Sequence, residues 1–285
     1  MKRAQNPVSE EAPSVPVLIR PSYNPQSRSG LFRLLVIPFA IYFIWMIVTA
    51  LFEGDHQLFR YADPQGIIVY TVFSCIITGM IIPVYCIRES FVTGAVNLFQ
   101  IGFMPVRRTL YACALTLFFG YLVRDLFSPS GADGVAFVYS FLLLLPTAIA
   151  SVMVCWALLG THVQAFVRDG GTVISIAAGI LVTAWLFCIT SFAHSPPVQL
   201  QPALVGFLVL GLAAAVFFFA VRDVYAASIF VAFGLSLVMA DRTGVSVSQA
   251  AAPAVYGSAL LAVITLLGIH WYFIRNFRTV ALPGK

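Results

Sequence analysis

The four histidines and eleven acidic residues are the side chains best suited to acid–base or metal chemistry in this chain. The histidines are His56, His162, His194 and His270; no two have metal-ligand spacing, and there is no HExxH motif. His56 follows Glu53-Gly54-Asp55 in a segment predicted to be a loop. We interpret this cluster as hydrated, with a weak divalent-metal site as the alternative. We therefore expect no metal site and no cofactor.

Five carboxylates stand next to an arginine at the edge of an apolar segment. Adjacent residues do not face each other on a helix, so we expect these acids to be solvated helix ends rather than ion pairs. No acid falls near the middle of an apolar segment, and GxSxG, Walker and GxGxxG motifs are absent from the sequence. We therefore predict no catalytic residue. The five acids are Glu89, Asp125, Asp169, Asp223 and Asp241.

Composition points to lipid as the solvent of most of the chain. Hydrophobic residues make up 60% of the sequence and charged residues only 9%, whereas soluble proteins are about a quarter charged. The net charge of +5 comes from residues that flank apolar segments, which argues against a nucleic-acid partner. The five cysteines lack CxxC spacing and lie in or beside apolar segments, so we interpret them as small core residues.

Eight apolar segments have about the length that crosses a hydrocarbon core of ~30 Å. Each must be helical, because a backbone in lipid has to satisfy its own hydrogen bonds. The predicted fold is an all-α, polytopic transmembrane helix bundle at residues 31–275, between a disordered cytoplasmic tail at 1–30 and a short cytoplasmic tail at 276–285. The predicted spans are 31–52, 66–87, 107–127, 134–158, 172–193, 203–221, 224–240 and 254–274.

The distribution of Lys and Arg predicts the orientation. With the N-terminus in the cytoplasm, all of the 16 Lys and Arg residues except Arg60, Arg124 and Arg242 fall on the inside. An even number of spans returns the C-terminus to the same side. We expect both termini to be cytoplasmic and the protein to lie in a prokaryotic inner membrane.

The sixth and seventh segments are separated only by Arg222 and Asp223. A single helix over 203–240 would be about 57 Å long, far longer than the membrane core. We therefore expect a turn at the membrane interface with Arg222 snorkelling to water, followed by a short span inside the bundle.

Small residues and prolines predict close packing and kinks. Ser175 with Gly179, Gly211 with Ala215, and Ser258 with Ala262 are each four residues apart on one helix face, which lets helix backbones approach. Prolines at positions 38, 83 and 146 should kink their helices.

Three segments follow one another in a familiar order: 97–108 leads into the third span, 160–171 is the polar exit expected after the fourth span, and 218–239 contains the tight turn. This order resembles the CPBP family (CAAX-protease and bacteriocin-processing proteins, or Abi family) of eight-helix intramembrane proteins. The resemblance covers residues 35–275. Within it, Gln164 and Arg168 fall in the stretch after the family's Glu-Glu-x-x-x-Arg-Gly motif.

The resemblance does not extend to the family's catalytic residues. Aligning Gly160 with the motif glycine places Val154 and Cys155 at the paired glutamates and Leu159 at the arginine. An aliphatic side chain and a thiol cannot replace the carboxylates that activate water. The Phe-x-x-x-His motif falls at Thr183 and Phe187, or at Thr190 and His194, and the last motif falls at Phe233 and Leu237, so the resemblance implies a non-catalytic member.

The resulting hypothesis is a CPBP-like pseudoenzyme that binds a membrane-protein partner, a peptide or a lipid within the bilayer. Alternatives are a transporter or permease component, favoured by helices broken at proline, and a structural subunit of a larger membrane complex. The expected cavity is apolar. It is lined by Val154, Cys155, Trp156, Leu159, Thr183, Phe187, His194 and Phe233.

Overall fold

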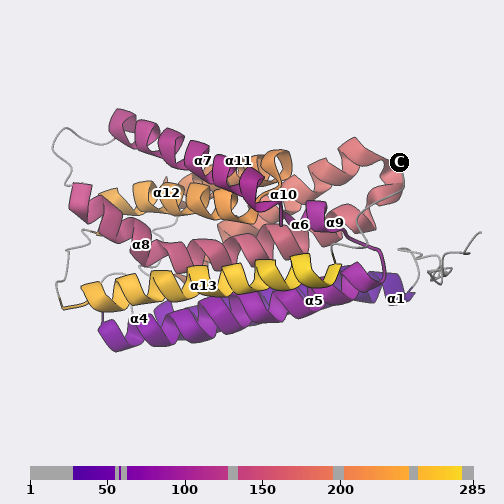
Figure 1. Cartoon of the computed structure of the whole chain (residues 1–285), viewed down its shortest axis with the longest axis horizontal. Coiled ribbons are helices and arrows are strands. Elements are labelled where there is room, and N and C mark those ends of the chain that lie inside the picture. Colours follow the sequence, from indigo (N-terminus) through magenta and orange to yellow (C-terminus); the bar gives the residue numbers. More distant parts are fainter. Residues whose placement is uncertain are drawn as a thin grey trace, which may run out of the picture.

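A computed structural model describes residues 28–54, 58, 63–127, 134–194, 202–243 and 250–277. Over these residues the chain forms helices and no strands. Seven helical stretches are long and apolar enough to cross a membrane, and a shorter apolar helix, Val224–Leu237, lies between the last two. The predicted all-α, multi-pass bundle is confirmed, and Figure 1 shows its helices running side by side.

The helical elements follow the predicted spans closely. The first span is Phe32–Gly54, close to the predicted 31–52, and its helix begins earlier, at Arg28. In chain order the elements are α1 (Arg28–Leu31), η1 (Phe32–Val36), α2 (Ile37–Thr49), η2 (Ala50–Gly54), α4 (Pro64–Tyr70), η3 (Thr71–Ile81), α5 (Ile82–Val92), α6 (Leu98–Ile101), α7 (Val106–Phe127), α8 (Gly134–Ser151), η4 (Val152–Gly160), α9 (Thr161–Phe166), η5 (Arg168–Gly170), α10 (Thr172–Thr190), η6 (Ser191–Ala193), α11 (Pro202–Val221), α12 (Val224–Thr243) and α13 (Ala252–Phe277).

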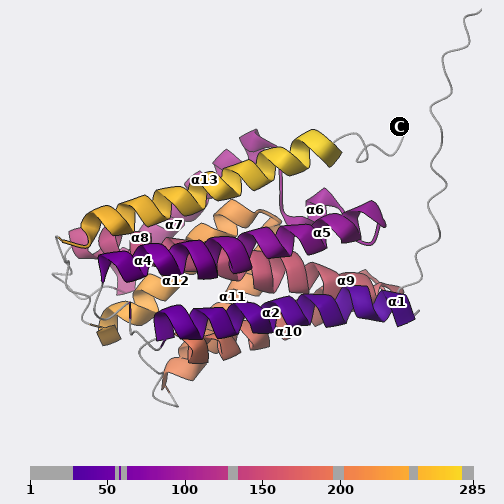
Figure 2. The same ribbon diagram turned by 90° about the horizontal axis from the view of Figure 1, so that it is seen from below.

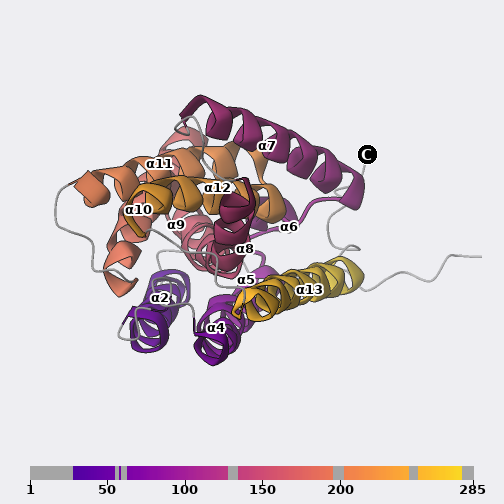
Figure 3. The ribbon, with the colours of Figure 1, turned by 90° about the vertical axis from the view of Figure 1, so that its left-hand side faces the viewer.

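The fourth span is the centre of the bundle. It joins α8, η4 and α9 into one helical stretch, Gly134–Phe166, in which every residue from 143 to 165 is buried. Figure 3 shows α8 in the middle of the other helices. The prediction that this span ends at 158 in a polar exit was wrong. The helix continues to Phe166 because His162 and Gln164 find hydrogen-bond partners inside the protein.

Wide π-helical turns accompany the prolines. The π-helical segments η1 and η3 each end with a backbone N–H bonded five residues back, from Ile37 to Phe32 and from Ile82 to Ile77. Pro38 and Pro83 follow directly at the start of the next α-helix. Proline has no N–H to donate and its ring crowds the carbonyl of the preceding turn, so a widened turn makes room for the ring. Pro146 lies within α8, shortly before η4.

The helices α7 and α12 differ sharply in burial. Between Val224 and Leu237, α12 has no exposed residue, which confirms the expected short span inside the bundle. By contrast, α7 buries only about a tenth of its apolar stretch. Figure 1 and Figure 3 show it lying across α11 and α12 at the edge of the bundle. Lipid therefore has access to both sides of α7.

The first and last helices place their outer ends together. In Figure 1, α1 and the final turns of α13 lie at the same end of the bundle. This arrangement follows from an even number of crossings. We call this end the arginine end, because Arg88, Arg108, Arg222 and Arg275 all belong to helix ends or turns there.

Close helix contacts occur at the predicted small residues. A Cβ placed on Gly211 of α11 would lie 2.9 Å from the Ala184 carbonyl oxygen of α10, and one on Gly179 would lie 3.1 Å from the Gly160 carbonyl oxygen. These distances are too short for a side chain to fit without moving a neighbouring backbone. The three helices therefore meet backbone to backbone, as small residues permit in membranes.

We expect Gly211→Leu to destabilise the bundle by about 1–3 kcal/mol, because the new side chain must push α10 away. The matched control is Gly257→Leu in α13, where a Cβ would meet nothing within 4 Å. Detergent-induced unfolding of the two variants measures the difference. Equal stabilities would contradict the close contact.

Candidate functional site

A buried ion pair joins the first and fifth spans at the end opposite the arginine end. His194 Nδ1 lies 2.8 Å from Glu53 Oε2, and the side chains are 8% and 0% exposed. The carboxylate can only accept, so the ring N–H donates to it. Gly54 makes the approach possible, because a Cβ there would lie 2.7 Å from the Ala193 carbonyl oxygen. The pair thus ties the ends of two spans together.

Hydroxyl pairs continue the polar layer around Glu53. Thr49 and Ser74 hydroxyls lie 2.6 Å apart, and Tyr70 and Thr147 hydroxyls lie 2.8 Å apart. A cavity of about 10 Å³ adjoins His194, at the lower limit for one water molecule. These hydrogen bonds join the first, second, fourth and fifth spans, and the cavity beside them is too small to admit a substrate.

The interpretation of Glu53 as a hydrated loop residue was wrong, because the side chain is fully buried by its contact with His194. The remaining members of that cluster, Asp55 and His56, lie outside the described residues. Among the residues that are described, no group of three or more His, Cys, Asp or Glu could hold a metal ion.

Arg222 occupies the turn between α11 and α12 and is also buried. Its guanidinium donates from one terminal nitrogen to the Gln100 carbonyl oxygen at 3.1 Å, and from the other to Gln164 Oε1 at 3.0 Å. It lies 4.5 Å from the centre of the Phe219 ring. Burial lowers the pKa of Arg222 to about 10, which leaves it charged at neutral pH. The prediction that it snorkels to water was wrong, since only 5% of it is exposed.

The backbone of Arg222 adopts the left-handed conformation, with φ of 55°. Glycine usually ends a helix in this way, and another residue there is strained. The side-chain hydrogen bonds explain why arginine is held there. Asp223, expected to be a solvated helix end, is instead fully buried: it accepts from the Thr109 hydroxyl at 2.6 Å and from the Ala226 N–H at 2.9 Å.

The other acids beside arginines behave differently. Glu89, Asp125 and Asp169 are exposed, as predicted, and the side chain of Asp241 lies outside the described residues. Whether such an acid is buried or exposed depends on its position relative to the other helices. Asp223 lies where α7 passes over the turn, whereas the three exposed acids lie at ends that no other helix covers.

His162 and Ser90 form a second buried polar pair near the arginine end. His162 Nδ1 lies 2.7 Å from the Leu158 carbonyl oxygen and Nε2 lies 2.7 Å from Ser90 Oγ. Since the carbonyl only accepts, Nδ1 carries the proton, and Ser90 donates to Nε2. Both side chains are buried. This geometry satisfies a core histidine and links the second span to the fourth.

The eight residues expected to line one cavity separate into several environments. Val154, Cys155, Trp156, Leu159 and Thr183 are fully buried in the packed core. The Trp156 and Phe187 rings are in contact, with centroids 5.1 Å apart. Phe187 and His194 line the cavity of about 10 Å³. Phe233 belongs to a different and much larger hollow, described next.

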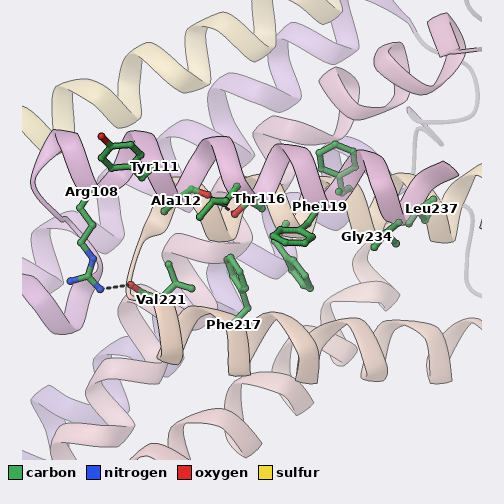
Figure 4. A pocket seen from close by; sticks show the side chains of 14 residues that line it. Arg108, Tyr111, Ala112, Thr116, Phe119, Phe217, Val221, Gly234 and Leu237 are labelled. Carbon is green, nitrogen blue, oxygen red and sulfur yellow. Dashed lines mark hydrogen bonds between the residues drawn. The ribbon is translucent and has the colours of Figure 1, made fainter. Parts of the chain in front are cut away.

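A half-open groove of about 670 Å³ runs between α7 on one side and α11 and α12 on the other. We call it the α7 groove. Its walls are almost entirely apolar, including Leu115 and Phe119 of α7, Phe217 of α11 and Phe233 of α12. Figure 4 shows Arg108 at one end and Leu237 at the other, with Phe119 and Phe217 between them.

Arg108 closes the groove at the arginine end. Its guanidinium donates to the Val221 carbonyl oxygen at 3.2 Å, drawn as a dashed line in Figure 4, and lies 5.6 Å from the centre of the Phe99 ring. Gly120 lets α7 settle on α12, because a Cβ there would lie 2.7 Å from the Phe233 ring. The groove therefore combines an apolar channel with one positive charge at its mouth.

The sequence contained no signal for this groove, because its walls are ordinary apolar residues of membrane helices. Only Phe233 of the predicted cavity residues belongs to it. Comparisons with known proteins assign no family: a scan against models of protein families, a search of curated proteins and a search of solved structures each found no match.

Proposed function

We propose that this integral membrane protein binds one acyl chain of a membrane lipid in the α7 groove. The observation that supports this proposal is the groove itself, a half-open apolar channel of about 670 Å³ with Arg108 at one end. Its lining runs along α7 from Arg108 to Val123, about 22 Å at the α-helical rise. Burying a hydrocarbon chain there removes it from bulk lipid without requiring any polar partner along the channel.

The dimensions favour a chain over a helix as the occupant. Spread over about 22 Å, the volume gives a mean cross-section of about 30 Å², whereas a helix about 10 Å across needs about 80 Å². The charge of Arg108 suits an anionic lipid headgroup at the mouth. A peptide in extended form would leave its backbone hydrogen bonds unmade in this apolar channel.

The proposal includes the setting expected from the sequence. The arginine end is cytoplasmic, the membrane is a prokaryotic inner membrane, and the chain is a non-catalytic CPBP-like protein. The charge distribution supports the first of these points. The replacement of the motif carboxylates by Val154 and Cys155 supports the last, because neither side chain activates water.

A palmitoyl lipid that carries a photoreactive diazirine in its chain tests the proposal. The full chain, reconstituted in vesicles, should be labelled mainly in peptides of α7, α11 and α12. Ala112→Trp places an indole in the groove and should lower that labelling several-fold, because the indole occupies space that the acyl chain would fill.

The control is Ala114→Trp, which adds the same indole to the exposed face of α7 outside the groove lining. Its labelling pattern should match the unsubstituted protein. Uniform labelling of all lipid-facing helices, or equal labelling of the two tryptophan variants, would refute selective binding in the groove.

A further inference from the structure

A second hollow lies between η3–α5 and α13, on the opposite side of the bundle from α7. It has a volume of about 400 Å³ and is half-open. We call it the α13 groove; its lining includes Ile81, Tyr85 and Arg88 from the second span and Thr265, Gly268 and Tyr272 from α13. Figure 2 shows α13 close to α4 and diverging from α5 towards the arginine end.

The hollow is open beside Gly268 of α13, which has no side chain to fill it. The lining residues of each helix are three or four positions apart and so lie on one face of it. Side chains on two such facing surfaces normally pack into the spaces between one another. At Gly268, however, a Cβ would meet nothing within 4 Å. Since the neighbouring α5 and α13 surfaces diverge there, the space is left for a ligand from the bilayer.

The mouth of the α13 groove is positively charged and aromatic. Arg88 lines it, and Arg275 lies one turn beyond Tyr272 on α13. Within the described ranges neither arginine is within 4.0 Å of a carboxylate. Glu89, next to Arg88, is about 100° further around the helix. Arg275 lies 5.0 Å from the centre of the Trp271 ring, which is 62% exposed, as an interfacial anchor would be.

We propose that the α13 groove binds an anionic phospholipid of the leaflet at the arginine end. The phosphate is held by Arg88 and Arg275 at the mouth, with the Tyr85 hydroxyl as a further donor. One acyl chain enters between Ile81 and Gly268. Guanidinium groups recognise phosphate oxygens through paired, charge-assisted hydrogen bonds, which a zwitterionic headgroup partly cancels with its own cation.

Native mass spectrometry of the full chain in mild detergent tests this site. The probes are phosphatidylglycerol and phosphatidylcholine with identical acyl chains. The unsubstituted protein should retain phosphatidylglycerol about tenfold more strongly, or about 1.4 kcal/mol, because the choline cation of phosphatidylcholine offsets part of the attraction between its phosphate and the arginines. Arg88→Ala should remove the preference, whereas Arg168→Ala, an exposed arginine outside the groove, should preserve it.

Glycine variants on α13 provide the matched test of the acyl-chain path. Gly268→Leu should fill the groove and abolish retention, whereas Gly257→Leu should not, although a Cβ is unobstructed at both positions. Both variants should keep the stability of the parent. Equal retention of the two lipids by the parent, equal retention by the two leucine variants, or a co-purifying polypeptide displaced by Gly268→Leu would overturn the proposal.

This inference stands independently of the α7 groove. Ala112→Trp leaves the α13 groove unchanged, and Gly268→Leu leaves the α7 groove unchanged, because no lining residue is shared. Loss of diazirine labelling selectivity alone would remove the proposed function only. Loss of phosphatidylglycerol selectivity alone would remove the α13 site only.

Discussion

Replacing His194 by alanine is expected to destabilise the protein by about 3–5 kcal/mol, because it leaves the Glu53 carboxylate buried without this partner. Glu53→Ala should cost a similar amount, because it removes the same contact from the buried His194 side chain. The pair lies between the ends of the first and fifth spans, so the loss should first release these two ends. Unfolding of the purified variants by denaturing detergent measures the free energy.

Non-additivity is the sharper readout for this pair. The double variant Glu53→Ala/His194→Ala should cost less than the sum of the two single variants, since either single change already removes the contact between the two side chains. Glu89→Ala is the matched control; Glu89 is exposed, and its loss should change stability by no more than about 0.5 kcal/mol. Strictly additive single effects would show that the two side chains do not depend on each other.

Arg222→Ala is expected to lower stability by about 3 kcal/mol. The variant loses two hydrogen bonds from a charged group, to Gln100 and Gln164, each worth ~1.5–3 kcal/mol in general, and keeps the strained left-handed backbone. The free energy of unfolding should fall. The labelling of single cysteines introduced into α11 and α12 should rise, because this turn anchors both helices to α6 and α9.

Arg222→Gly separates the side chain from the backbone. Glycine also loses the hydrogen bonds but relieves the left-handed strain, about 1–2 kcal/mol, so it should be more stable than the alanine variant and less stable than the parent. Arg168→Ala is the exposed control and should change little. A glycine variant at least as stable as the parent would show that the guanidinium contributes no more than the backbone strain that glycine relieves.

The spans could be predicted from the sequence because the bilayer imposes their length and hydropathy locally. The predicted and observed boundaries of the fifth span are the same, 172–193. The fourth span was placed too short because His162 and Gln164 look like residues of a loop. Their partners, Ser90 and Arg222, lie 72 and 58 residues away in sequence and could not be inferred from neighbouring positions.

The same reason explains the errors on buried charges. Glu53 follows an apolar run, and Asp223 lies between two, so each looks like a hydrated end. Whether such a residue is hydrated depends on which distant element covers it: His194 is 141 positions from Glu53, and Thr109 is 114 from Asp223. The types and spacing of the neighbouring residues do not show which distant helix covers the acid.

The two grooves lie beyond sequence reasoning for a different reason. Their walls are made of residues that any membrane helix uses, and their volumes depend on how far α7 and α13 diverge from their neighbours. Divergence is a property of the packed bundle. Gly268 was not distinguished from the other glycines by its sequence context, although its empty surroundings make it the residue on which the α13 groove depends.

The π-helical segment η3 has a consequence for the rotational phase of the second span. Each widened turn holds one more residue than an α-helical turn, and one residue corresponds to about 100° of rotation in the helix that follows. The segment η3 therefore rotates α5 about the helix axis relative to α4. Helix α4 packs on α13, and Tyr85 and Arg88 of α5 face the same helix further along. The direction in which Tyr85 and Arg88 point is thus determined by the π-helical segment that precedes them in the chain, which ends at Ile81.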